Sequence, residues 1–196
     1  MKSIISFLLL LIPCILLAQE HYTDAVQKHQ DNYVQTHEVV TGADRKHLAF
    51  FPIDKTYRVE ARFERRENSP WFLMETSGTM KKMYRVYGTL TFTIRDTVQR
   101  LNVYQSQSLM QTDQYRNYLF IPFTDATSGR ETYAVGRYYD LLADEIVEGK
   151  VVIDFNKVYN PYCAYVSGVY NCPIPPKENR LSIAIRAGEK AYGKEH

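Results

Sequence analysis

The sequence has few cysteines, little net charge and none of several common site motifs. Three of its 196 residues are cysteine, and 24 basic against 22 acidic residues leave a formal charge of +2. So small a charge gives no electrostatic reason to expect nucleic acid or an anionic membrane surface as a partner. The motifs G-x-G-x-x-G, G-x-x-x-x-G-K-S/T, H-E-x-x-H and G-x-S-x-G are absent, and we predict no cofactor.

One long apolar run, from Ile4 to Leu17, predicts an export signal over residues 1–18. Lys2 precedes the run and Ala18 ends it, as in a cleavable leader. A membrane-spanning helix needs roughly 20 apolar residues, so we predict no membrane span. Lipid attachment at Cys14 is the minor alternative, although Pro13 occupies a place where lipoprotein leaders carry a small residue. We therefore expect an exported protein, periplasmic or extracellular.

Two cysteines remain after the leader is removed, Cys163 and Cys172. An even pair in an exported protein predicts a disulfide, because the compartments outside the cytoplasm are oxidising.

An amphipathic helix is predicted over residues 23–38. Its apolar stripe has helical spacing and consists of Tyr22, Val26, His29, Tyr33, His37 and Val40. A metal site is not predicted, because residues 29 and 37 are about 12 Å apart along a helix axis. A zinc ion reaches its ligands at about 2 Å.

Alternating apolar and polar residues predict most of the remaining chain to be β-strands. The predicted strands cover residues 57–64, 71–76, 89–94, 101–104, 119–123, 133–141, 151–155 and 181–185. We predict a β-rich α+β fold, a bent antiparallel sheet or barrel of about 7–8 strands with one N-terminal helix. A two-sheet β-sandwich is the alternative. The predicted parts are the signal peptide 1–18, a helical segment 19–47 and a β-rich domain 48–196.

The stretch from Asp154 to Arg180 contains four of the eight prolines and both mature cysteines. Proline fixes φ and removes a backbone donor, so this stretch is predicted to be an ordered, non-helical loop that carries the site. Next to it, Arg137 is in phase with the apolar residues of its strand. A buried arginine needs a partner, so we expect either a structural pair with Asp154 or Glu178, or an anion clamp.

The predicted ligand-binding residues are Arg137, Asp154, Asn156, Asn160, Tyr162, Glu178, Asn179 and Arg180. The acids Asp140, Asp144, Glu145 and Glu148 are instead predicted to form a solvated turn, since their spacing does not match a calcium loop.

Three functions remain open from these residues. The first is a non-enzymatic module outside the cytoplasm that binds a small polar or anionic ligand where the 154–180 loop meets the Arg137 strand. The second is a hydrolase in which Asp154, Glu178 or Glu189 is the general base at the same place. The third is a structural envelope protein whose tyrosine-rich surface meets a partner protein.

Several stretches resemble a known family. They are PFTDATSGRETYAVGRY (residues 122–138), DFNKVYNPYCAY (154–165), CPIPPKENRL (172–181) and AGE (187–189). In this order they are similar to the bacterial family DUF1684, a domain of unknown function. Val158 and Ile174 depart from its usual Ala and Leu. The resemblance implies membership of this family and brings no activity with it.

Overall fold

The computed structural model describes residues 4–194, with side chains from residue 20 onward. Helix α1 spans Ile4–Thr36, so it ends close to the predicted end but begins well before residue 23. The predicted signal peptide 1–18 lies outside the residues whose side chains are described, and it stays a prediction. Among the described residues, no helix has both the length and the apolar character needed to cross a bilayer.

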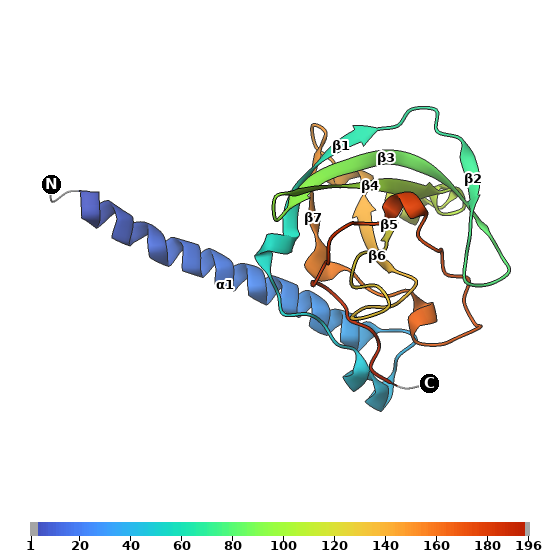
Figure 1. The fold of residues 1–196 in the computed structure, drawn as a ribbon, viewed down its shortest axis with the longest axis horizontal. Coiled ribbons are helices and arrows are strands. Elements are labelled where there is room, and N and C mark those ends of the chain that lie inside the picture. The colour runs from blue at the N-terminus through green and yellow to red at the C-terminus, as the bar shows by residue number, and fades with distance from the viewer. Residues whose placement is uncertain (1–3, 195–196) are drawn as a thin grey trace.

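The second half of α1 packs against the β-rich body (Figure 1). Val26 and His37 of the predicted stripe are buried, whereas His29 is exposed and Gln30 is buried. Gln30 donates a hydrogen bond of 3.1 Å to the backbone carbonyl of Asn156. The packed face of the helix is therefore partly polar, and it is held by hydrogen bonds as well as by apolar contact.

Seven antiparallel strands form one curled sheet, a half-barrel (Figure 1). The strands are β1 (Arg58–Arg65), β2 (Trp71–Met74), β3 (Lys82–Ile94), β4 (Thr97–Ser106), β5 (Tyr118–Phe123), β6 (Arg137–Leu142) and β7 (Lys150–Asp154). Their order is β6-β5-β4-β3-β1-β7, and β2 pairs with β3. The bent-sheet prediction is confirmed, and a single sheet is found instead of the two sheets of a sandwich.

Short 3-10 helices occur in the connections. They span Gly42–His47, Lys55–Tyr57, Leu109–Gln111, Asp113–Tyr115, Ala143–Glu145, Phe155–Lys157, Tyr162–Ala164 and Lys177–Asn179. A hairpin joins β3 and β4, and its two turn residues, Arg95 and Asp96, both have positive φ. A two-residue turn of this kind matches the twist of the strands that it joins.

A β-bulge at Tyr87 reverses the side chains of β3. Val86 pairs with Tyr104, whereas Gly88 pairs with Val103, so two steps along β3 match one step along β4. Paired residues point to the same face of a sheet, and neighbours in one strand point to opposite faces. The even-numbered residues of β3 therefore change face at this bulge.

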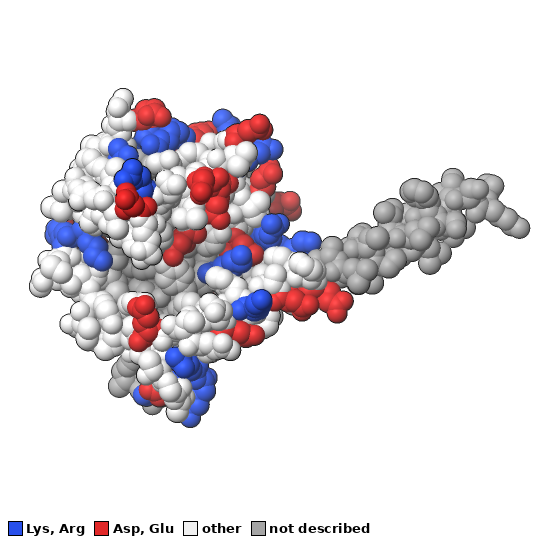
Figure 2. All heavy atoms as spheres, turned by 180° about the vertical axis from the view of Figure 1, so that it is seen from behind, with Lys and Arg blue, Asp and Glu red and all other residues white. Residues whose placement is uncertain are grey.

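Two apolar clusters result, one on each face. The larger cluster is the main core and includes Leu90, Leu101, Leu119, Ile121, Leu141 and Phe155. The smaller cluster consists of Met74, Tyr84, Tyr104, Phe120 and Tyr138. Charged side chains of both signs are interspersed over the surface seen from behind (Figure 2).

Two strand predictions in the C-terminal half of the chain are wrong, one in its length and the other entirely. The strand predicted over 133–141 begins only at Arg137, because Gly136 has a φ of 118° and closes a turn with Tyr133. The strand predicted over 181–185 is not a strand. Its neighbour is the loop at 124–126, so scattered bonds such as Leu181 N to Thr124 O (2.8 Å) replace a regular ladder. Leu181 and Ile185 are nonetheless buried in the main core.

Candidate ligand-binding cavity

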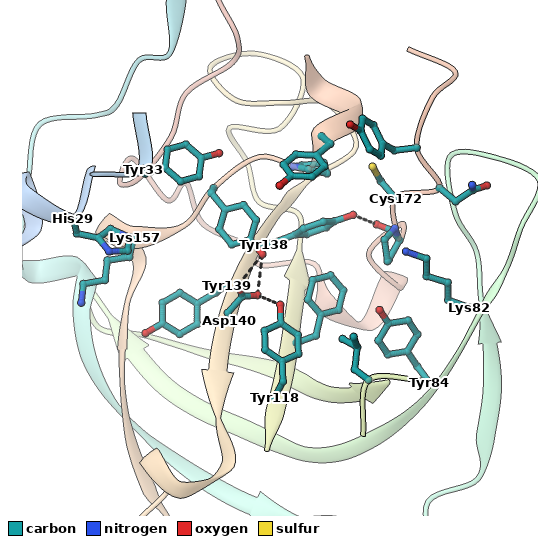
Figure 3. Close-up of a pocket in the computed structure, with 18 of the residues that line it drawn as sticks. His29, Tyr33, Lys82, Tyr84, Tyr118, Tyr138, Tyr139, Asp140, Lys157 and Cys172 are labelled. Carbon is teal, nitrogen blue, oxygen red and sulfur yellow. Dashed lines mark hydrogen bonds between the residues drawn. The ribbon is translucent and has the colours of Figure 1, made fainter. Parts of the chain in front are cut away.

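An open cavity of about 730 Å³ lies beside the smaller cluster (Figure 3). Its walls come from α1, β3, β5, β6 and the segment 155–173. The lining residues are His29, Tyr33, Lys82, Tyr84, Leu109, Tyr118, Phe120, Tyr138, Tyr139, Asp140, Glu145, Lys157, Tyr159, Pro161, Tyr162, Tyr170, Asn171, Cys172 and Pro173. Its volume and its aromatic walls are those of a site for a small organic molecule.

The carboxylate of Asp140 lies among these rings. In β6, Asp140 pairs with Phe120 of β5, which puts both side chains on the face of the smaller cluster. The Tyr118 hydroxyl donates to Oδ1, and the Tyr159 hydroxyl lies 2.9 Å from both carboxylate oxygens. The Asp140 residue as a whole is exposed, while its carboxylate lies among the tyrosine rings. Desolvation by these neighbours raises the pKa of Asp140, and the two tyrosine hydroxyls oppose that shift.

The tyrosines around Asp140 stay protonated. Burial raises the pKa of Tyr159 well above its usual value, and the charge of Asp140 raises it further. The same two causes raise the pKa of Tyr118. Both hydroxyl hydrogens are used on Asp140, so the phenol oxygens and the carboxylate present only acceptor lone pairs to the cavity.

Three basic side chains also line the cavity, Lys82, Lys157 and His29 (Figure 3). Burial lowers the pKa of Lys82. Burial and the neighbouring charge of Lys157 lower the pKa of His29. Among the described residues, neither lysine forms an ion pair, whereas the adjacent Lys81 lies 2.5 Å from Glu75. The cavity thus combines two carboxylates, those of Asp140 and Glu145, with aromatic walls and with lysine ammonium groups that form no ion pair among the described residues.

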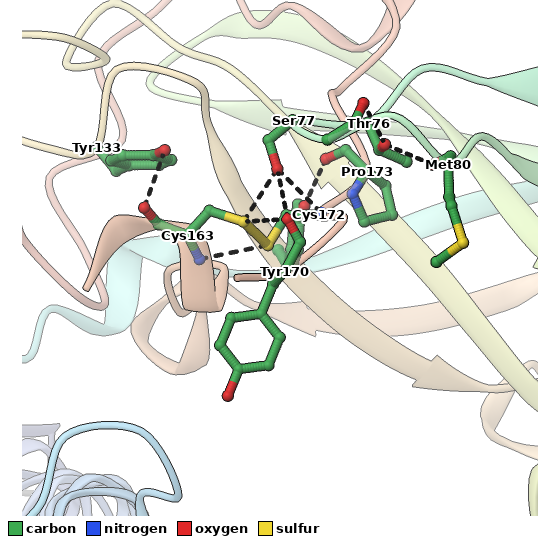
Figure 4. Close-up of a disulfide and its surroundings, with 10 residues drawn as sticks. Thr76, Ser77, Met80, Tyr133, Cys163, Tyr170, Cys172 and Pro173 are labelled. Carbon is green, nitrogen blue, oxygen red and sulfur yellow. Dashed lines mark hydrogen bonds between the residues drawn. A yellow bond between two sulfur atoms is a disulfide. The ribbon is translucent and has the colours of Figure 1, made fainter. Parts of the chain in front are cut away.

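The disulfide Cys163–Cys172 is present and fixes one wall of the cavity (Figure 4). Ser77, in the turn after β2, donates its backbone N–H to the Cys172 carbonyl at 2.9 Å. Its hydroxyl accepts a hydrogen bond from the Cys172 backbone N–H at 3.1 Å. The Tyr138 hydroxyl donates to the Pro173 carbonyl from the other side. These bonds connect the proline-rich segment to both β2 and β6.

Arg137 lies elsewhere, inside the main core. Its side chain is fully buried and forms an ion pair of 3.0 Å with Asp125. It also donates to the backbone carbonyls of Ile185 (2.7 Å), Ala187 (2.6 Å) and Glu189 (3.0 Å). The prediction that Arg137 pairs with Asp154 or Glu178 is wrong. Asp125 and the backbone carbonyls of the C-terminal segment are its hydrogen-bond partners instead. Arg137 joins the end of the chain to the sheet.

Asp154 and Asn156 hold α1 against the body. The Tyr22 hydroxyl donates to both Asp154 oxygens at 3.0 and 3.1 Å. Asn156 is buried and donates to the backbone carbonyl of Asp54 at 2.9 Å. Asp154 also accepts from the backbone N–H of Asn156, which begins the 3-10 helix at Phe155.

The other predicted site residues are dispersed. Asn179 is fully buried and bonds to the backbone N–H and C=O of Asn102 at 2.8 and 2.9 Å. Asn160 is also fully buried and donates to the Lys190 carbonyl. Glu178 and Arg180 are exposed. Tyr162 alone of the predicted set lines the cavity. The structure therefore does not gather these eight residues into one site.

Glu189 forms a second tyrosine–carboxylate group, separate from Asp140. It accepts from Tyr165 at 2.7 and 2.8 Å, from Tyr33 at 3.0 Å and from the Asn160 backbone N–H at 2.8 Å. Burial raises the pKa of Glu189 to about 7, although these donors act in the opposite direction. Glu189 and Asp154 have separate sets of partners, so each holds a different part of the fold.

Asp140 was missed in the sequence, where it was grouped with a solvated acidic turn. A signal was available. Tyr118 and Phe120 alternate with Leu119 and Ile121, so both faces of β5 are apolar or aromatic. A strand with two such faces covers a second buried region, and Asp140 lies opposite one of its members. Among the residues the structure describes, no three His, Cys, Asp or Glu side chains group in a way that could hold a metal ion.

Fold and cavity together define a half-barrel protein with one N-terminal helix and a tyrosine-lined hollow. The chain belongs to the DUF1684 family of proteins of unknown function, whose profile matches residues 44–190. A solved relative is the uncharacterized protein from gene locus rrnAC0354 of Haloarcula marismortui, determined by solution NMR. It is 30% identical, with a TM-score of 0.65, and the match covers 88% of this chain and 96% of that one. No curated protein matches.

Proposed function

We propose that the tyrosine-lined cavity binds a small polar organic molecule through a hydrogen-bond donor placed on Asp140. The observation that carries this proposal is the pair of tyrosine hydroxyls already bound to the carboxylate. The hydrogens of both hydroxyls are used on Asp140, so this group of three side chains can accept further hydrogen bonds but donate none. An amine, ammonium or hydroxyl group of a ligand supplies the missing donor, and the aromatic rings contact its apolar part.

The site thus lies at the 155–173 segment and not around Arg137. Arg137 has its guanidinium nitrogens Nη1 and Nη2 occupied by the protein, which disfavours an anion clamp there. The hydrolase and partner-protein hypotheses gain no specific support from the contacts of Asp154, Glu178 and Glu189.

A thermal-shift screen of the mature protein tests the proposal. The panel contains small amines, amino acids and sugars, and each is measured with the native protein, with Asp140→Asn and with Asp144→Asn. Asp144 is an exposed acid near the end of the same strand, so its variant is a matched control for the loss of one charge. We expect a ligand that raises the melting temperature of the native and control proteins and loses most of that effect in Asp140→Asn.

Stabilising ligands that act equally on all three proteins contradict the proposed site. A panel in which no compound stabilises the native protein also counts against it, since the cavity is open and accessible in the unliganded protein.

We also propose that the protein acts outside the cytoplasm after removal of residues 1–18. The apolar run behind Lys2 supports this, and the Cys163–Cys172 disulfide suits an oxidising compartment. Mass spectrometry of the protein from its native host should find Gln19 as the first residue. A retained Met1 contradicts export by cleavage, and a lipid-sized mass addition at Cys14 supports the anchored alternative.

A further inference from the structure

Asp140 and Lys82 lie on different walls of the cavity. Asp140 belongs to β6 and lies against Tyr118 and Tyr159, whereas Lys82 begins β3 on the other side of the cavity (Figure 3). Rings join the two walls, since Phe120 lies 4.7 Å from Tyr138 and 5.8 Å from Tyr84 between ring centroids. A ligand that reaches from one charge to the other therefore passes over a continuous aromatic surface.

Lys82 is suited to bind an anion. Its ammonium has no carboxylate partner among the described residues, and it lines the cavity while the neighbouring Lys81 pairs outside with Glu75. The Lys82 side chain is exposed at the rim of the cavity, where the nearby walls still lower the pKa of its ammonium by desolvation. An ammonium without a counter-ion gains free energy when an acidic group approaches.

The Asp140 carboxylate is suited to bind a cation. Oδ2 receives only the Tyr159 hydroxyl, which it shares with Oδ1, so it retains room for another donor. The negative charge of the carboxylate favours a cationic donor over a neutral one, because hydrogen bonds between ionised partners are the stronger ones.

We propose that the ligand of this cavity is a zwitterion with separated charges, its ammonium on Asp140 and its acidic group on Lys82. The proposal rests on the cavity being the binding site. It excludes a ligand with adjacent charges, such as glycine, because the two protein charges lie on different walls. The apolar middle of the ligand, aliphatic or aromatic, lies over Phe120, Tyr84 and Tyr138.

Isothermal titration calorimetry with two matched sets of compounds tests this. One set is ω-aminohexanoic acid, hexylamine and hexanoic acid. The other is para-aminomethylbenzoic acid, benzylamine and para-toluic acid. Within each set the apolar part stays the same, a hexyl chain or a benzene ring, and one charged group is removed at a time. The contacts of the apolar part therefore contribute similarly to the affinity of all three compounds. We expect the zwitterion of at least one set to bind about tenfold more tightly than its single-charge partners, and glycine not to bind.

Variants then assign each charge. In Lys82→Gln the affinity of the zwitterion should exceed that of the amine by no more than about twofold. In Asp140→Asn the affinity of the zwitterion should exceed that of the acid by no more than about twofold. Lys81→Gln removes the same charge one residue away and should leave both advantages unchanged. Lys157→Gln tests the other lysine of the cavity, and loss of the advantage there instead of in Lys82→Gln overturns the assignment to Lys82.

Equal binding of the amine and the zwitterion overturns the zwitterion while leaving the Asp140 site intact. Equal binding of the acid and the zwitterion overturns both. If no member of either set binds, the zwitterion inference is wrong, and the proposed function is then judged by the broader panel of amines and sugars.

Discussion

Two carboxylates in this protein each accept hydrogen bonds from two tyrosine hydroxyls, but one carboxylate is buried and the other is open to solvent. Glu189 accepts hydrogen bonds from Tyr33 and Tyr165, and Asp140 accepts them from Tyr118 and Tyr159. Glu189 is fully buried, whereas Asp140 is open to the cavity. A backbone N–H, that of Asn160, completes the set around Glu189. No such third donor bonds to Asp140 among the described residues.

The difference shows how one motif serves two purposes. Where α1, the 155–173 segment and the C-terminal segment all close on the carboxylate, the group stabilises the fold. Where one side stays open, the same group keeps unused acceptor capacity that a ligand can fill. The number of remaining lone pairs, and not the presence of tyrosines, therefore separates a structural carboxylate from a binding one.

Truncating each carboxylate in its own variant should give the largest difference in stability. We expect Glu189→Ala to destabilise the fold by about 3 kcal/mol, because it leaves the Asn160 N–H and one tyrosine hydroxyl without an acceptor, while the Tyr33 and Tyr165 hydroxyls keep the bond of 2.8 Å to each other. At roughly 2–4 °C per kcal/mol for a chain of this size, the melting temperature should fall by about 10 °C. Asp140→Ala should lower it by no more than a few degrees. Equal losses in the two variants would refute the distinction.

The pH dependence of stability should come next in size. Glu189 has a pKa of about 7 in the folded protein against 4.5 as its ordinary value. The folded state therefore binds more protons between these values, so the contribution of Glu189 to stability is complete below about pH 4.5 and is lost as pH rises through about 7. The decrease due to Glu189 should be about 3 kcal/mol. Denaturant titrations of the native protein and of Glu189→Gln at several pH values isolate the contribution of Glu189. If the free energy of unfolding depends on pH in the same way in both proteins, the pH dependence is not due to Glu189.

Removing the disulfide should lower the stability of the fold and weaken ligand binding in the cavity that contains Asp140. Cys163 and Cys172 are nine residues apart, and the loss of the constraint should cost roughly 2–3 kcal/mol. We expect Cys163→Ser to lower the melting temperature by several degrees and to weaken ligand binding, since Cys172 lines the cavity. Reduction of the native protein should reproduce both effects. An unchanged melting temperature, together with free thiols in the protein isolated from its host, would refute the bridge.

The smallest expected change is the stability of Asp140→Asn. Asn keeps one oxygen as an acceptor for the tyrosines, and the site is open to water, so we expect less than about 1 kcal/mol. Thermal unfolding of this variant beside Asp144→Asn measures it. A loss as large as that of Glu189→Ala would show that Asp140 is needed for folding, which would weaken its assignment to a ligand.

The sequence was sufficient for the features set by local pattern. Alternation predicted the strands, and phase predicted that Arg137 lies in the core. The partner of Arg137 was not predictable, because Asp125 is in a loop and the other acceptors are backbone carbonyls of residues 185–189. Such contacts depend on how distant segments cross. Asp140 was missed for a related reason, since the cavity arises only when α1 and residues 155–173 cover one face of the sheet.

The extra residue at Tyr87 has a wider consequence. By reversing the phase of β3 midway, it places the even-numbered residues before the bulge on the face with the cavity and those after it in the main core. Substitutions before the bulge, at Lys82 or Tyr84, can change what the hollow accepts while the packing beyond Gly88 stays intact. The proposed binding surface and the main core are thereby assigned to different halves of one strand.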